Sequence, residues 1–133
     1  MSIKKSLFIF SLAIMLTSCS CFETSPKSGV NFSTVDEVAK AISTNASKVA
    51  VLDVNPESVR NEKGVIPNAI QLSSYNSYEL KELPNDKKTE LIFYCYNESC
   101  GASTQAANRA IENGWNNVSI MREGIIGWNN LYK

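Results

Sequence analysis

Short apolar runs alternate with segments of helical periodicity through most of this 133-residue chain. This alternation favours a parallel sheet, because a parallel pair of strands needs a long crossover connection that a helix supplies. The fold class expected is therefore α/β, with helices on both faces of the sheet. Strands are predicted at 49–54, at a brief run ending at residue 72, at 91–94 and at 118–121. Helical segments are predicted from residue 35 onward, at 78–83, at 102–113 and at 127–132.

Local signals predict where helices start and which side faces the core. Thr34 and Glu37 form a capping box, in which a hydroxyl and a carboxylate satisfy the free amides of the first turn. Asn55 is expected to cap a turn or short helix that has Pro56 as its first residue. In the last helix, Leu131 is expected to face inward.

The first eighteen residues predict export from the cytoplasm. Lys4 and Lys5 form a charged start, and the ten residues 7–16 form an apolar run. That run is too short to span a bilayer, which takes about 20 apolar residues. It fits a secretory signal peptide at residues 1–18.

The segment Leu16-Thr17-Ser18-Cys19 resembles the lipobox of bacterial lipoproteins. The resemblance implies cleavage before Cys19 and acylation with chains such as palmitate. The protein would then be exported and lipid-anchored to a membrane of the cell envelope, on its periplasmic or extracellular side. Ordinary cleavage nearby, with Cys19 unmodified, stays open as an alternative. The polar residues 19–31 are expected to form a tether ahead of a single domain at 32–133.

The charge pattern argues against a nucleic-acid partner. The chain carries 13 basic and 13 acidic side chains. Removal of the predicted signal peptide takes away two lysines and leaves a mildly acidic protein with no basic cluster. Such a surface lacks the cations that displace counterions from a phosphate backbone. We therefore expect no nucleic acid among the partners, and membrane contact through the lipid anchor.

Cys95 ends the third predicted strand, and a polar loop leads from it to a second cysteine, Cys100. Because ligands of α/β sheets sit at the carboxyl ends of strands, this loop is the first candidate for a site.

Three other kinds of cysteine site fit the loop poorly. A zinc site would also need Cys19 and Cys21 as ligands, since the chain has no histidine, and the usual paired spacing of zinc ligands is absent. A thioredoxin-type C-x-x-C motif has two intervening residues, whereas four are present here. A C-x5-R phosphatase loop needs an arginine where Gly101 stands.

Five short motifs follow one another through the body of the chain. They are Leu52-Asp53-Val54, Gly64-Val65-Ile66-Pro67-Asn68-Ala69-Ile70, Ile92-Phe93-Tyr94-Cys95, Gly114-Trp115-Asn116-Asn117-Val118 and Glu123-Gly124-Ile125-Ile126-Gly127-Trp128. In this order and spacing they resemble the rhodanese, or thiosulfate sulfurtransferase, homology domain, from roughly residue 35 to 132. The resemblance implies a three-layer fold around a five-stranded parallel sheet, with Cys95 carrying sulfur as a persulfide. It further implies a monomer without metal or cofactor, whose partners are a small sulfur donor and a thiol acceptor, or a thiol-redox protein.

The chain departs from the family pattern around the expected site. Asn55 stands where the family has an arginine, and Val65 stands where it has a histidine. The loop is longer than the commonest one, and Glu98 within it is expected to repel a dianion such as thiosulfate. Either Arg60 or Arg122 would have to fold over the site to compensate. The expected substrate-binding loop consists of Tyr96, Asn97, Glu98, Ser99, Cys100 and Gly101.

A reactive thiolate at Cys95 also has a physical basis that does not depend on the family. The start of a helix lowers the pKa of a nearby thiol, because free amides and the helix dipole favour negative charge. The amides of residues 96–101 are expected to point at the Cys95 sulfur, so that no histidine base is needed. Asp53, at the end of another strand, is expected to support the loops by accepting backbone hydrogen bonds, with Arg60 as a further candidate support.

Three functions stay open at this point. The first is sulfur transfer through Cys95. In that case Cys100 could attack the persulfide, expel hydrosulfide and close a Cys95–Cys100 disulfide that switches the domain off until a thiol reduces it. The second is a binding module with the rhodanese fold and no catalysis. The third is a purely structural disulfide, because paired cysteines outside the cytoplasm are usually oxidised.

Overall fold

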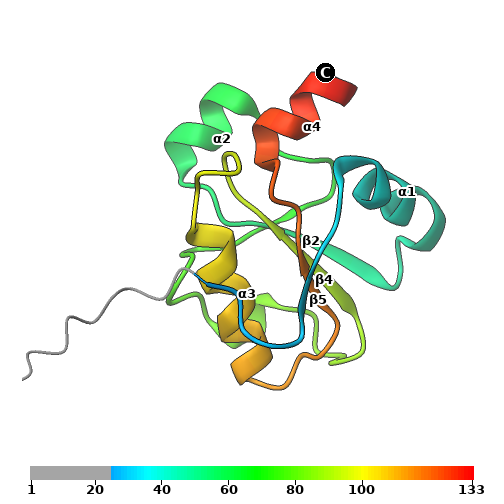
Figure 1. Cartoon of the computed structure of the whole chain (residues 1–133), viewed down its shortest axis with the longest axis vertical. Coiled ribbons are helices and arrows are strands. Elements are labelled where there is room, and N and C mark those ends of the chain that lie inside the picture. The colour runs from blue at the N-terminus through cyan, green and yellow to red at the C-terminus, as the bar shows by residue number, and fades with distance from the viewer. Residues whose placement is uncertain (1–24) are drawn as a thin grey trace, which may run out of the picture.

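Five parallel strands form one sheet in the order β1-β5-β4-β2-β3 in the computed structural model, which describes residues 25–133 (Figure 1). The strands are β1 (Val30–Phe32), β2 (Val49–Asp53), β3 (Ile70–Gln71), β4 (Glu90–Tyr94) and β5 (Val118–Ile120). The helices are α1 (Val35–Asn45), α2 (Glu57–Lys63), the 3-10 turn η1 (Leu80–Glu82), α3 (Ala102–Glu112) and α4 (Gly124–Tyr132). The predicted α/β class and the five-stranded parallel sheet are confirmed.

The predicted signal peptide, the lipidation site Cys19 and most of the predicted tether lie outside the described residues. Within residues 25–133, no helix is long and apolar enough to cross a membrane. Export and lipidation therefore stay predictions from the sequence.

Alternate residues of the central strands face two separate apolar layers. In β4, Leu91 and Phe93 pack in the layer that includes α3, while Ile92 and Tyr94 pack in the layer that includes α1, α2 and α4 (Figure 1). Because successive side chains of a strand point to opposite faces, a strand covered on both sides reads as a continuous apolar run. Cys95 continues the first series and belongs to the layer under α3.

Strand β1 is not predicted from the sequence, and it begins at Val30, inside the stretch expected to be a tether. Its residues are half-buried or exposed, so they lack the apolar pattern that marks a central strand. Val30 pairs with Val118 of β5 at the edge of the sheet. Just upstream, the buried Asn108 of α3 donates from Nδ2 to Ser25 O (2.9 Å) and accepts at Oδ1 from Lys27 N (2.7 Å). The chain is therefore fixed to the domain from residue 25 onward.

The predicted helix starts are correct to within a residue for α1 and α2. Thr34 Oγ1 accepts from Glu37 N (3.3 Å) and Glu37 Oε2 accepts from Thr34 N (2.8 Å), which confirms the capping box. In α2 the N-cap is Pro56, not Asn55. The shift has a local cause, because the amide of Asn55 is turned back to donate to Asp53 Oδ1 (2.8 Å).

Helix α4 begins at Gly124, three residues before its predicted start. The prediction that Leu131 faces the core is wrong, since 60% of its surface is exposed. Trp128 is partly buried and packs against the apolar layer that includes α1 and α4. The earlier start follows from contacts with the loop after Cys95, which are not visible in the periodicity of the helix itself.

Candidate active site

Cys95 directly follows strand β4, and only 2% of its surface is exposed. Cys100 ends the loop that leads to α3 and is partly buried. Both are free thiols. They line one pocket of about 570 Å³, whose other walls include the connection from β2 to α2 and the segment 72–75. This volume lies in the range of ligand pockets, and the pocket lies at the carboxyl edge of the sheet where ligands of α/β folds bind.

Cys95 Sγ donates to the carbonyl oxygen of Cys100 at 3.4 Å. The Cys100 thiol is also within hydrogen-bonding reach of the Cys95 sulfur, as an alternative partner for the same proton. The backbone amides of Ala102 and Tyr96 point at the Cys100 sulfur. The hydrogen bond from Cys95 lowers the pKa of Cys100 to about 5, with help from the two amides and against the effect of burial. The hydrogen bond to Cys100, together with burial, raises the pKa of Cys95 above its ordinary value. These directions favour a negative charge on Cys100 over one on Cys95, whereas the sequence led us to expect the lowered pKa at Cys95.

The loop amides do not surround Cys95 as expected, because the loop uses some of them internally. Ser99 N donates to Asn97 Oδ1 (3.0 Å), and Cys100 N donates to Asn97 O (3.1 Å). Asn97 thereby builds a tight turn in the middle of the loop. The amide and hydroxyl of Ser103, in the first turn of α3, do hydrogen bond to the Cys95 sulfur and favour its charged form. Their effect is smaller than the opposing effects of Cys100 and burial.

The start of α4 holds the backbone of the loop in place. Ile125 N donates to Cys95 O (2.9 Å) and Ile126 N donates to Tyr96 O (3.1 Å). Gly124, which precedes them, has φ +61° and lies so close to the loop that an added Cβ would be 2.5 Å from Tyr96 O and 2.6 Å from Cys95 O. Only glycine fits such an approach without displacing the loop. This explains the first glycine of the Glu123-Gly124-Ile125 motif, whose role the sequence alone does not reveal.

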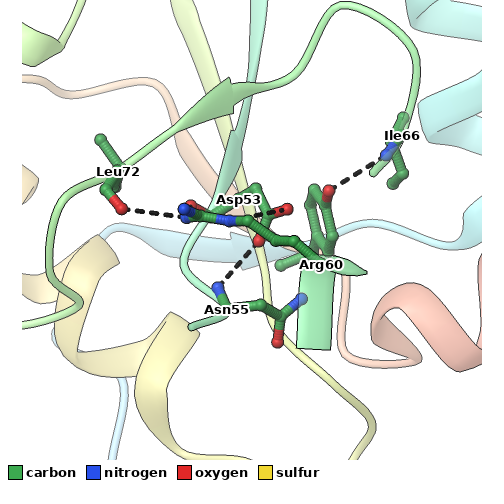
Figure 2. A network of polar contacts seen from close by, with 6 residues as sticks. Asp53, Asn55, Arg60, Ile66 and Leu72 are labelled. Atoms are coloured by element: carbon green, nitrogen blue, oxygen red, sulfur yellow. Dashed lines mark hydrogen bonds and ion pairs between the residues drawn. The ribbon is translucent and has the colours of Figure 1, made fainter. Parts of the chain in front are cut away.

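A buried ion pair supports the pocket from the side of α2 (Figure 2). The Asp53 side chain has no exposed surface, and its Oδ2 lies 3.4 Å from Arg60 Nε. Arg60 Nη2 also donates to Asp53 O (3.0 Å) and to Leu72 O (2.9 Å), as the dashed lines of Figure 2 show in part. Asp53 Oδ1 also accepts a backbone hydrogen bond from Asn55 N (2.8 Å), as expected. Arg60 does not fold over the thiols but stays in the pocket wall, bound to Asp53.

Asn55 is a pocket residue that the sequence marks only as a departure from the family pattern. It has 3% of its surface exposed, and it lines the cavity that contains both thiols. Its Nδ2 is buried and has no hydrogen-bond partner in the structure. An unpaired buried amide is costly, so this donor is a natural partner for an acceptor atom of a bound molecule. The guanidinium beside Asp53 comes from Arg60.

Glu98 and Arg122 lie on the other side of the loop from Cys95. Both line a second pocket, of about 280 Å³, in which Cys100 also takes part but Cys95 does not. The carboxylate of Glu98 is thus not in the wall of the pocket that contains Cys95, and its position gives no support to the expected repulsion of an anionic donor. Arg122 lies over the ring of Phe32, 5.2 Å from the ring centroid.

Among residues 25–133, no three His, Cys, Asp or Glu side chains are grouped so that they could hold a metal ion. Cys19 and Cys21, which a zinc site would have needed, lie outside this range.

Comparison with known proteins agrees with this geometry. Residues 34–131 match the family model of the rhodanese-like domain. The chain belongs to the rhodanese-like family. No curated protein matches the chain. The match covers every element that forms the pocket, from α1 to α4, so the pocket with its two thiols is that of a rhodanese-like domain.

Several solved structures share the fold of this rhodanese-like domain. A rhodanese-related protein of Thermoplasma volcanium is 19% identical with a TM-score of 0.60, and the match covers 77% of this chain and 93% of that one. A single-domain sulfurtransferase of Saccharomyces cerevisiae is 19% identical with a TM-score of 0.61, over 81% of this chain and 92% of that one. A protein of Rhodopseudomonas palustris described as a possible tyrosine phosphatase is 18% identical with a TM-score of 0.64, over 78% and 83% of the two chains. At these identities the likeness shows the fold alone.

Proposed function

We propose that this rhodanese-like domain is a sulfurtransferase that carries sulfane sulfur as a persulfide on Cys95. The observation that carries the proposal is the placement of a free thiol at the carboxyl end of central strand β4, at a pocket of about 570 Å³, with a second thiol in contact. The family membership and the yeast sulfurtransferase with the same fold support it. The two alternatives, a binding module without catalysis and a structural disulfide, both predict that Cys95 takes up no sulfur.

In the loading step, the Cys95 sulfur attacks the outer sulfur of the donor. The bond from that sulfur to the rest of the donor breaks, and the remainder leaves with the electron pair. The departing group or water takes the Cys95 proton as the attack occurs, because the Cys100 thiolate, with its lowered pKa, is too weak a base for a thiol whose pKa is raised. In the second step an acceptor thiolate attacks the outer sulfur of the persulfide, and the Cys95 sulfur leaves and takes a proton from water. Neither step needs a histidine base.

The pocket walls favour a small donor with a hydrogen-bond acceptor or a negative charge. Asn55 presents an unpaired amide donor, and Arg60 brings a guanidinium into the same wall. Glu98 lines the pocket of about 280 Å³ and is not among the residues that line this one. Donors of the small sulfane class therefore fit this pocket better than the sequence alone indicates.

Cys100 can also inactivate the domain for sulfur transfer by forming a disulfide with Cys95. Its thiolate can attack the inner sulfur of the Cys95 persulfide, so that hydrosulfide leaves and a Cys95–Cys100 disulfide forms. The raised pKa of Cys95 favours this direction, because Cys95 is then the poorer leaving group of the two sulfurs. A dithiol reductant or a thiol-redox partner would restore both thiols.

We further propose that the domain works outside the cytoplasm, with residues 1–18 removed and Cys19 lipidated. This rests on the short apolar run and on the Leu16-Thr17-Ser18-Cys19 segment. The N-terminal peptide of membrane-fraction protein tests it by mass spectrometry, and an unmodified Cys19 inside a longer peptide would contradict it.

The sulfur-transfer proposal is tested by measuring transfer from a sulfane donor to a thiol acceptor in wild type and in Cys95→Ser and Cys100→Ser variants. We expect Cys95→Ser to abolish transfer and Cys100→Ser to leave a slower but measurable loading step. Transfer that survives in Cys95→Ser would overturn the assignment. Circular dichroism of each variant shows that a loss of activity is not a loss of fold.

A further inference from the structure

The two thiols differ in how they can be reached. Cys100 lines both the pocket of about 570 Å³ and the pocket of about 280 Å³ on the other side of the loop. Cys95 lines only the first of these and has 2% of its surface exposed. An incoming molecule can therefore reach Cys100 through either pocket, whereas Cys95 is almost fully buried and contributes to only one of them. The Cys95 sulfur lies 3.4 Å from the carbonyl oxygen of Cys100, so the two cysteines are in contact.

We propose that this pair of thiols also reduces small disulfides, with Cys100 as the attacking thiol and Cys95 as the resolving thiol. The Cys100 sulfur attacks one sulfur of the substrate, the substrate S–S bond breaks, and one thiolate leaves with the electron pair. That thiolate takes the Cys95 proton, and the Cys95 sulfur attacks the Cys100 sulfur and releases the second thiolate, which takes a proton from water. The substrate gains two electrons, and the protein is left with a Cys95–Cys100 disulfide. A dithiol reductant supplies the two electrons that return the pair to its starting state.

Contacts in the loop divide the two roles between the thiols. An attacking thiol must be accessible and charged, and the amides of Tyr96 and Ala102 face the Cys100 sulfur and stabilise charge there. A resolving thiol must lie against the attacking one, and Cys95 does so while it is shielded from the substrate. The two cysteines therefore have different roles in the two reactions. Cys95 carries sulfur in the transfer reaction, and Cys100 is the attacking thiol in the reaction with disulfides.

The second pocket indicates which disulfides fit. Its wall carries one cation, Arg122, and one carboxylate, Glu98, next to Cys100. A carboxylate of the substrate pairs with the guanidinium, and an ammonium group pairs with the carboxylate. We therefore assign the substrate to the class of amino-acid disulfides, such as cystine, whose halves carry both groups. This assignment does not depend on whether Cys95 carries sulfur.

The test uses the full chain, reduced and then exposed to cystine near neutral pH, with acid quenching and peptide mapping. Cys95 and Cys100 both fall within residues 89–109, a stretch bounded by Lys88 and Arg109 and thus released by trypsin as one peptide. In Cys95→Ser we expect a mixed disulfide to accumulate on Cys100, because the resolving thiol is gone. In Cys100→Ser we expect Cys95 to react at least about tenfold more slowly, because its thiol is buried and protonated. Equal rates in the two variants, or no reaction in either, would overturn the proposal.

Early quenching of wild type gives the same information without a substitution. The transient mixed disulfide should lie on Cys100, and a mixed disulfide on Cys95 would contradict the proposal.

A substitution in the pocket of about 280 Å³ tests the substrate class. We expect Arg122→Gln to slow the reaction with cystine several-fold but not the reaction with cystamine, which has no carboxylate. An equal effect on both probes would overturn the substrate class. Persulfide loading by a sulfane donor is measured separately, so a domain that loads Cys95 but ignores cystine disproves only this inference.

Discussion

Arg60 Nε lies 3.4 Å from the Oδ2 of Asp53, whose side chain has no exposed surface at the end of strand β2. The same guanidinium donates through Nη2 to the carbonyls of Asp53 and Leu72 and so ties the end of β2 to the segment after β3. Arg60 of this pair also lines the pocket that contains both thiols.

Replacement of Arg60 by glutamine should destabilise the domain by about 3 kcal/mol, because it leaves a buried carboxylate without its cation. Urea unfolding measures the change. Arg122→Gln is the matched control, since Arg122 is exposed and its loss should change the free energy of unfolding by less than about 0.5 kcal/mol. Similar stabilities for the two variants would show that the ion pair contributes little.

Gly124→Ala should disrupt the loop after Cys95, because the new Cβ would lie 2.5 Å from Tyr96 O in a backbone conformation with φ +61°. We expect a loss of about 3 kcal/mol or more in stability, together with a loss of sulfur transfer. Gly114→Ala is the control: its φ is also positive, at +99°, but the nearest atom, Lys87 Cε, is 3.9 Å away. That variant should lose about 1 kcal/mol and keep its activity. Equal losses would mean that the approach of Gly124 to the loop is not what requires glycine.

The pH dependence of alkylation should separate the two cysteines. The hydrogen bond from Cys95 lowers the pKa of Cys100 to about 5, so Cys100 should react with iodoacetamide at pH 6, while the protonated Cys95 should not. Cys95→Ala removes the donor and raises the pKa of Cys100 toward its ordinary value. The rate at pH 6 should then fall by about tenfold, because less thiolate is present. A wild-type rate for Cys100 that rises only near pH 9 would contradict the assigned charge.

Repeated turnover should make wild-type sulfur transfer dependent on an added dithiol, because some persulfide is lost to the Cys95–Cys100 disulfide. Cys100→Ser cannot form this bond, so its activity should not change when the dithiol is added. Transfer rates with and without dithiol measure the effect. If both proteins respond equally, Cys100 does not act as a redox gate, and the role of Cys95 is unaffected.

Much of the fold could be predicted because its central strands are apolar on both faces. The run at 91–94 marks β4, and the capping box at Thr34 marks the start of α1. Strand β1 could not be predicted, since its three residues are half-buried or exposed and are held by pairing with β5. The start of α4 depends on hydrogen bonds from Ile125 and Ile126 to a loop about thirty residues earlier in the chain, and no local pattern contains that information.

The place of Cys95 at the end of a strand could be predicted, but the contacts of its sulfur could not. Cys95 lies at a strand end because the apolar run stops there, and the sequence shows this directly. The pKa of each thiol depends on the backbone amides that face it. Two of the amides expected to face Cys95, those of Ser99 and Cys100, instead donate to Asn97. The partner of Arg60 is likewise set by the fold, because helix α2 brings its guanidinium back over Asp53.

The most direct test of the central claim is the mass of the peptide 89–109 after the reduced protein has been incubated with a sulfane donor. The account predicts the added mass of one sulfur atom, located on Cys95 by fragmentation, removed by a reductant and absent in Cys95→Ser. A peptide that stays unmodified in a folded, fully reduced protein, or a sulfur atom located on Cys100 instead, would contradict it.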